Sequence, residues 1–186
     1  MDGFDLIHND NAGHRKGGKI AVIRSSDKGV TWEKKATIVA HDLSIGVTDP
    51  STGTPVRTGN LEPDFAVDRS SNTLTRGNLY AVWQDARFSG GDHDEIAFSR
   101  SSDGGDTWSA PKRISTPTGK PAFTAAIDVN ENGTIGVVYY DFRNDDSGAP
   151  LVTDVWLTTS LHELPFTPSG SRRRPLTGSR TSSRAA

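Results

Sequence analysis

Two aspartate–arginine pairs are the residues best suited to binding a charged ligand. The sequence Asp-x-Arg occurs from Asp85 to Arg87 and again from Asp141 to Arg143, each time directly after an apolar run that is typical of a strand. The planar guanidinium group binds a carboxylate through two parallel hydrogen bonds. Arg87 and Arg143, with Asp85 and Asp141 beside them, are therefore candidate substrate-binding residues. Because the triplet is repeated, the alternative is an ion pair in each repeat that only supports the fold.

Three further residues are candidates for catalysis. Glu62 and Asp64 stand where the next repeat has alanine and threonine. An acid at a cavity without a counterpart in the next repeat is a candidate general acid, and a capping carboxylate in a turn is the alternative. Tyr140 is the third candidate. Neighbouring strand residues point to opposite faces, so only one of Tyr139 and Tyr140 can pack inward, and an active tyrosine needs a carboxylate or base beside it.

Metal binding is a weaker hypothesis. Asp103 and Asp106 stand close enough for a calcium loop, but Val30 occupies the position of Asp106 in the earlier copy of the same pattern. His93 lies in an acidic, glycine-rich loop where it can bind a metal, with a solvated loop histidine as the alternative. We therefore predict no metal and no cofactor, and a calcium-dependent module is only a third interpretation.

A repeated eight-residue pattern predicts the elements that position these residues. Ser-x-Asp-x-Gly-x-Thr-Trp occurs twice, each time between two short strand-like runs. The aspartate can accept hydrogen bonds from its own turn, the glycine supplies a positive φ, and the tryptophan can fold back as an apolar plug. The pattern therefore predicts two β-hairpins whose connections carry structural residues. These are Ser25, Asp27, Gly29 and Trp32 in the first copy and Ser101, Asp103, Gly105 and Trp108 in the second.

Both copies resemble the Asp-box, or BNR repeat, of the sialidase superfamily, and they match its pattern in full. The resemblance implies a β-propeller of four-stranded blades in which the box joins the third and fourth strands. It also implies a retaining glycoside hydrolase that acts on terminal acidic sugars with an arginine triad, an aspartate acid/base and a tyrosine nucleophile paired with a glutamate. The family's early Arg-Ile-Pro type motif is not found. Many activities share such propellers, so the resemblance predicts the fold more directly than the reaction.

The spacing of the repeats predicts about three blades, of which the first and last are incomplete. The two boxes lie farther apart in the sequence than the two triplets do. A long surface loop predicted at residues 41–60, which lies between the boxes but not between the triplets, accounts for the difference. Residues 1–18 are expected to form a loop or the end of a preceding unit. Closed propellers have about four to eight blades, so we predict an all-β partial propeller over residues 1–168, whose missing blades come from a longer chain or a partner. Residues 169–186 are expected to be a disordered basic tail.

Strand order predicts which loops share a rim. With strands numbered outward from the axis, the loops between the second and third strands lie on the same rim as the connections between blades. The opposite rim carries the boxes. The first rim gathers Asp85, Arg87, Asp92, His93, Asp94, Asp141, Arg143, Asp145 and Asp146, together with residues 41–64 and 116–121.

Composition excludes several classes of protein. A formal net charge of −2 argues against a general nucleic-acid binder. The absence of cysteine excludes disulfides and thiolate zinc sites. No stretch approaches the roughly 20 apolar residues of a membrane span, and the first residues show no signal-peptide pattern. Localisation stays open, although the resemblance suggests a secreted or extracellular parent.

The leading functional interpretation is a sialidase-like propeller protein, a glycoside hydrolase acting on terminal acidic sugars, with a glycan or glycoconjugate as partner. We expect this chain alone to be inactive, because three blades cannot assemble an arginine triad together with a nucleophile and an acid. The alternative is a non-catalytic propeller module that binds a glycan or a protein at the acidic rim.

Overall fold

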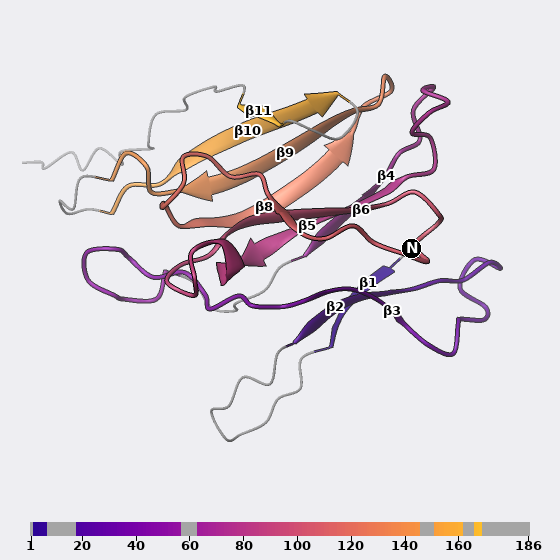
Figure 1. The fold of residues 1–186 in the computed structure, drawn as a ribbon, viewed down its shortest axis with the longest axis horizontal. Coiled ribbons are helices and arrows are strands. Elements are labelled where there is room, and N and C mark those ends of the chain that lie inside the picture. Colours follow the sequence, from indigo (N-terminus) through magenta and orange to yellow (C-terminus); the bar gives the residue numbers. More distant parts are fainter. Residues whose placement is uncertain (1, 7–17, 57–62, 146–150, 162–165, 169–186) are drawn as a thin grey trace, which may run out of the picture.

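The computed structural model describes residues 2–6, 18–56, 63–145, 151–161 and 166–168, and for residues 2–6 it describes the backbone only. Three antiparallel sheets account for almost all of the regular secondary structure in this part of the chain (Figure 1). The expectation of an all-β chain with about three blades is therefore confirmed. Glu62 and the tail at residues 169–186 lie outside the described residues.

Each sheet forms one blade, and its strands follow one another in chain order. Blade 1 contains β1 (Asp2–Leu6), β2 (Lys19–Ile23) and β3 (Thr37–His41). Blade 2 contains β4 (Asp64–Val67), β5 (Leu79–Asp85), β6 (Glu95–Ser101) and β7 (Lys112–Arg113), with a short 3₁₀ helix η1 (Ala86–Phe88) after β5. Blade 3 contains β8 (Ala122–Val129), β9 (Thr134–Asp141), β10 (Asp154–Leu161) and β11 (Thr167–Pro168).

The N-terminal segment differs from the expectation. We expected a loop or the end of a preceding unit over residues 1–18, but residues 2–6 form β1 and pair antiparallel with β2 of blade 1, with Phe4 opposite Ala21. The segment is short and mixed in polarity, so its sequence pattern does not distinguish a strand from a loop. Its place beside β2 makes β1 the equivalent of the second strand of blade 2.

The repeated eight-residue pattern forms the same hydrogen-bonded loop in both copies. In the second copy, which joins the third and fourth strands of blade 2, the Ser101 hydroxyl accepts from the Gly105 amide at 2.8 Å and donates to Asp103 at 2.7 Å. The Asp103 carboxylate accepts from the Thr107 amide at 3.0 Å and from the Thr107 hydroxyl. Gly105 has a φ of +94°, and a Cβ there would lie 3.2 Å from Leu79. The first copy repeats these contacts with Ser25, Asp27, Gly29 and Thr31.

These contacts favour the charged form of each aspartate. The Thr31 hydroxyl, followed by the Thr31 amide and the Ser25 hydroxyl, lowers the pKa of Asp27 to about 2. The equivalent donors, led by the Thr107 hydroxyl, lower the pKa of Asp103 well below its usual range. A carboxylate that accepts several hydrogen bonds within one turn holds that turn closed, so both loops are self-contained folding units.

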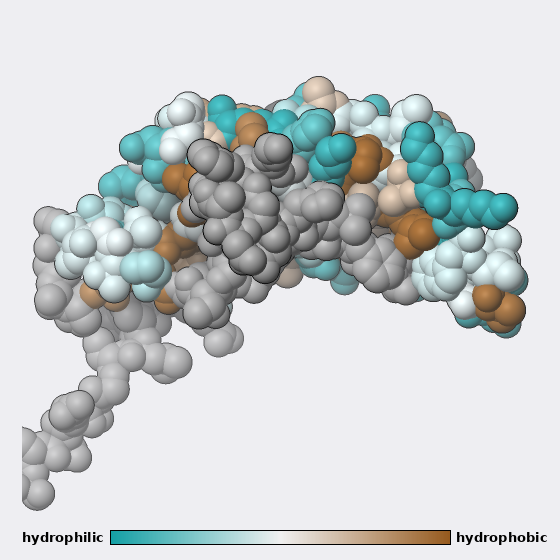
Figure 2. Space-filling view, turned by 90° about the horizontal axis from the view of Figure 1, so that it is seen from below, coloured by the Kyte–Doolittle hydropathy of each residue, from teal (hydrophilic) through white to brown (hydrophobic). Residues whose placement is uncertain are grey.

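The core lies between the blades rather than within them. Ile20 and Val22 of blade 1 pack against Ala81, Trp83 and Ala97 of blade 2. Successive residues of β5 and β6 alternate in direction, so Tyr80, Val82, Ile96 and Phe98 pack on the other side, against Ile135, Val137 and Tyr139 of blade 3. Blade 2 is consequently buried on both faces, and every residue of β5 is buried. The surface seen from the blade 1 side is curved, with hydrophobic patches between hydrophilic residues (Figure 2).

The two repeated tryptophans occupy the same loop position but differ in burial. Trp108 packs edge-on against Phe65, with ring centroids 6.2 Å apart, and joins the cluster between blades 2 and 1. Trp32 is 40% exposed and donates its ring N–H to the carbonyl of Gly29 in its own loop. A tryptophan in this position packs toward the preceding blade, and within the described residues no blade precedes blade 1. In blade 3, Phe166 packs back on Phe98 at 5.0 Å, although the pattern has no third copy.

Replacing each tryptophan with alanine should lower the free energy of unfolding by different amounts, because the two side chains differ in burial. We expect Trp108→Ala to lower the free energy of unfolding by about 3 kcal/mol, because it opens a cavity between blades 1 and 2. Trp32→Ala should cost less than about 1 kcal/mol, because much of its ring already contacts water. Urea unfolding monitored by circular dichroism measures both, and equal losses would contradict this packing.

Candidate functional site

A cleft of about 490 Å³ lies on the rim that the strand order assigned to the acidic loops. Four segments line it: part of the loop between blades 1 and 2 (residues 48–53), the β5–β6 loop (residues 92–93), the connection from blade 2 to blade 3 (residues 119–121), and the β9–β10 loop (residues 142–145). Three of the four segments adjoin the ends of β6, β8 and β9, so the packing of the blades sets much of the shape of the cleft.

Asp94 anchors the long loop that forms one wall of the cleft. Its carboxylate is buried and accepts hydrogen bonds from the Ser44 hydroxyl at 2.8 Å, the Ile45 amide at 2.9 Å and the Gly46 amide at 3.0 Å. Burial raises the pKa of Asp94, and these hydrogen bonds oppose that shift. The loop is therefore attached to blade 2, and most of the described residues of the surface loop expected at residues 41–60 are exposed.

The same loop is also held by apolar packing and by a turn of its own. Val47 is buried against Phe123 and Phe142 of blade 3. Further along, Asp49 accepts from the Ser51 amide at 2.8 Å and the Ser51 hydroxyl at 2.7 Å, and these contacts lower the pKa of Asp49. A bridge between Thr48 and Pro55 closes this turn. This wall of the cleft is thus a loop held in place by contacts with both blade 2 and blade 3.

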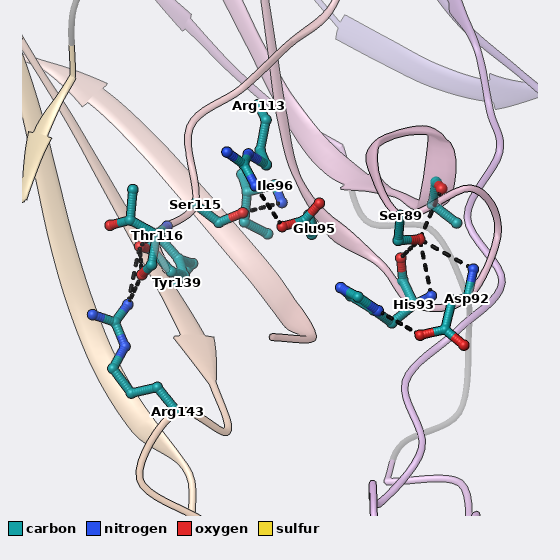
Figure 3. A network of polar contacts seen from close by, with 11 residues as sticks. Ser89, Asp92, His93, Glu95, Ile96, Arg113, Ser115, Thr116, Tyr139 and Arg143 are labelled. Carbon is teal, nitrogen blue, oxygen red and sulfur yellow. Dashed lines mark hydrogen bonds and ion pairs between the residues drawn. The ribbon is translucent and has the colours of Figure 1, made fainter. Parts of the chain in front are cut away.

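His93 lines the cleft and is oriented by its neighbours (Figure 3). The Ser89 hydroxyl accepts from the His93 amide at 3.0 Å and donates to the His93 carbonyl at 2.6 Å. The ring atom Nδ1 lies 2.9 Å from a carboxylate oxygen of Asp92. A carboxylate accepts hydrogen bonds, so Nδ1 carries the proton in the neutral ring and Nε2 is an acceptor. Among the described residues Nε2 is buried without a hydrogen-bond partner.

Both arginines of the repeated triplets are engaged within the chain. Arg87 lies 2.8 Å from the fully buried carboxylate of Asp85 and also donates to the carbonyl of His41. Arg143 donates to the carbonyl of Thr116 (Figure 3), binds Asp141 at 2.5 Å, and lies 3.4 Å from the ring centre of Trp156.

In each blade the pair therefore ties the loop after the second strand to the connection from the preceding blade. Neither Arg87 nor Arg143 is among the residues that line the cleft. Their assignment as substrate-binding residues stays a prediction.

Asp64 and Tyr140 are not brought together. Asp64 accepts a hydrogen bond from the Ile127 amide at 2.8 Å, which joins β4 to β8. Ile127 pairs with Val137, three residues from Tyr140 and thus about 10 Å along β9. Tyr140 is 38% exposed and stacks on Phe123. Tyr139 is the buried tyrosine of the two, and the alternation of strand residues had predicted that only one of them would pack inward. The catalytic assignments of Asp64 and Tyr140 remain predictions.

The described residues contain no cluster of three or more His, Asp or Glu side chains able to hold a metal ion. The two acids considered for a calcium loop have other partners, because Asp106 pairs with Arg24 at 2.5 Å while Asp103 closes its own turn. In the same part of the chain, no helix has the length and apolar character to cross a membrane.

The fold is similar to that of a solved structure described as Hadza microbial sialidase Hz136. The TM-score is 0.59 at 18% sequence identity, over 92% of this chain and 34% of the sialidase chain. Two structures of an α-L-arabinofuranosidase from Fusarium graminearum, both with an iminosugar inhibitor, match with a TM-score of 0.44 at 15% identity, over 77% of this chain and 37% of theirs. No family model and no curated protein matches. The chain thus has a sialidase-like fold and spans about a third of the sialidase's length.

Sequence reasoning located the rim but not all of the residues that shape the cleft. Asp92, His93 and Asp145 were assigned to this rim individually. Lys120 and Asp49 were included only through their segments, because a single lysine or aspartate in a loop carries no distinguishing pattern.

Replacing Asp94 with asparagine should release the loop that it anchors. The amide nitrogen would replace one of the two carboxylate oxygens and so place a donor against the backbone amide of either Ile45 or Gly46, and we expect a loss of about 2 kcal/mol in the free energy of unfolding. We also expect faster limited proteolysis within residues 42–56. The control is Asp92→Asn, whose side chain is 85% exposed. Proteolysis at the same rate in both variants would contradict the anchoring role.

Proposed function

We propose that the rim cleft binds a saccharide and that this chain binds it without hydrolysing it. The observation that carries the proposal is that residues with unlike polar side chains line one cleft: Asp92, Asp145, Lys120 and His93. Sugar hydroxyls both donate and accept hydrogen bonds, so a mixture of acceptors and donors suits them. The volume of about 490 Å³ falls in the range of roughly 300–1,000 Å³ that is usual for small-molecule sites.

The charge of the lining favours a neutral or amino sugar over an acidic one. Among the described residues, Asp49, Asp92 and Asp145 line the cleft, with Lys120 as the permanently charged cation. A carboxylated sugar would face this excess of negative charge. Withdrawing Arg87 to meet such a sugar would leave the buried Asp85 unpaired, at a cost of about 3–5 kcal/mol.

Two features support binding without hydrolysis. Retaining glycosidases place two carboxyl groups about 5–5.5 Å apart across the scissile bond, or use a tyrosine with a carboxylate beside it. Asp64 instead accepts a hydrogen bond from the backbone of β8, and Tyr140 stacks on Phe123. Hydrolysis of a terminal acidic sugar is a proposal for a longer protein with further blades, in which Arg87, Arg143 and Glu62 would take the roles that the resemblance implies.

Ligand-observed NMR with methyl galactoside, glucosamine and N-acetylneuraminic acid tests the proposal. We expect saturation transfer to the first two sugars and little to the third. Asp145→Asn should weaken binding at least about fivefold, the equivalent of roughly 1 kcal/mol. Glu131→Gln is the matched control, because Glu131 is exposed in the β8–β9 turn at the opposite rim.

A sialoside hydrolysis assay completes the test, and the wild-type chain should release no sugar. Turnover that Asp64→Asn abolishes would contradict binding without hydrolysis. Preferential binding of N-acetylneuraminic acid would contradict the assignment of the sugar class, and binding unaffected by Asp145→Asn would contradict the site.

A further inference from the structure

Blade 3 carries an apolar face that no other part of the described chain covers. Val138 and Tyr140 of β9 lie opposite Leu157 and Val155 of β10, so all four side chains project from the same side of the sheet. Val138 is 40% exposed, Tyr140 is 38% exposed, and Val155 and Leu157 are each 37% exposed. We call these four residues the end face of blade 3.

The repeat shows what this face is built to contact. Asp85 pairs with Glu95 in blade 2, and Asp141 pairs with Asp154 in blade 3, which aligns the two blades residue by residue. Val138, Val155 and Leu157 then correspond to Val82, Ile96 and Phe98. These blade 2 residues are at most 2% exposed, because blade 3 packs on them. The end face of blade 3 is therefore the unpaired equivalent of a blade-to-blade contact already present in the chain.

The other end of the arc carries the complementary half of such a contact. Ile20 and Val22 face blade 2, so Ala21 and its partner Ile38 face the opposite way, and Ile38 is 41% exposed. Trp32, which is 40% exposed, corresponds to the Trp108 that packs against the preceding blade. We call Trp32 and Ile38 the end face of blade 1.

We propose that two copies of this chain associate head to tail, with the end face of blade 3 of one copy on the end face of blade 1 of the other. The argument for a second copy is that the chain presents both halves of a contact that it makes twice internally, between blades 1 and 2 and between blades 2 and 3. Contact between two blade 3 faces has no such counterpart within the chain. A head-to-tail contact closes into a ring when the rotation permits, and otherwise extends. This association is independent of the saccharide proposal.

Light scattering coupled to size exclusion, on the full chain, tests the proposal. We expect the wild type to have at least twice the monomer mass at about 100 µM and to dissociate on dilution. Leu157→Lys and Trp32→Lys should each be monomeric, because each variant blocks one end face. Leu74→Lys is the matched control: Leu74 is 86% exposed in the β4–β5 turn, and its replacement should leave the wild-type mass unchanged.

Mixing the two blocked variants gives the sharpest result. The Leu157→Lys copy keeps its blade 1 face and the Trp32→Lys copy keeps its blade 3 face, so the mixture should form a dimer that neither variant forms alone. Circular dichroism melts establish that both variants are folded. A monomeric wild type would overturn the proposal. So would a Trp32→Lys variant that still associates by itself, since that result indicates contact between two blade 3 faces.

Discussion

Burial of one blade face against the next is the interaction on which this structure depends. A single four-stranded sheet with two apolar faces cannot bury either of them by itself. Blade 2 solves this by packing Ala81, Trp83 and Ala97 on blade 1 and Val82 and Phe98 on blade 3. The strands of blade 2 are therefore apolar on both sides, as is expected for a sheet that is covered on both faces. The two outer blades have one covered face each among the described residues.

The candidate site follows from this packing. Each pair of adjacent blades brings a loop between the second and third strands close to a connection between blades, and buried carboxylates link them. Asp85 and Asp141 hold arginines that reach the carbonyls of His41 and Thr116, while Asp94 accepts from the backbone amides of Ile45 and Gly46 in the loop between blades 1 and 2. Buried charged groups of this kind are costly unless every hydrogen bond is made, so they fix one arrangement of the rim.

Much of the fold was predictable from short-range chemistry. The Ser-x-Asp-x-Gly-x-Thr-Trp loops are determined within eight residues, so the sequence alone indicated both hairpins, and the repeat then indicated the blades. β1 was missed because five residues of mixed polarity have no strand pattern, and its pairing with β2 is a long-range contact. β7 contains only Lys112 and Arg113, which complete the ladder with β6.

The site was less predictable, because its residues act through contacts between distant segments. Strand order placed Asp92, His93 and Asp94 on the correct rim, but it could not show that Asp94 anchors a loop fifty residues earlier, at Ser44. Nor could it show that Arg143 stacks on Trp156. The repetition of the Asp-x-Arg triplet was informative, because it suggested an ion pair in each repeat as the alternative to substrate binding. Both triplets form such an ion pair within the chain.

Native-state hydrogen exchange tests the central claim, that the core lies on the two faces of blade 2. If it does, the slowest-exchanging amides should be those of β5 and β6, followed by the strands of blade 3 and then those of blade 1, because only blade 2 is covered on both sides. Slowest exchange in β9 and β10, or equal exchange in all three blades, would contradict a structure held together by packing between blades.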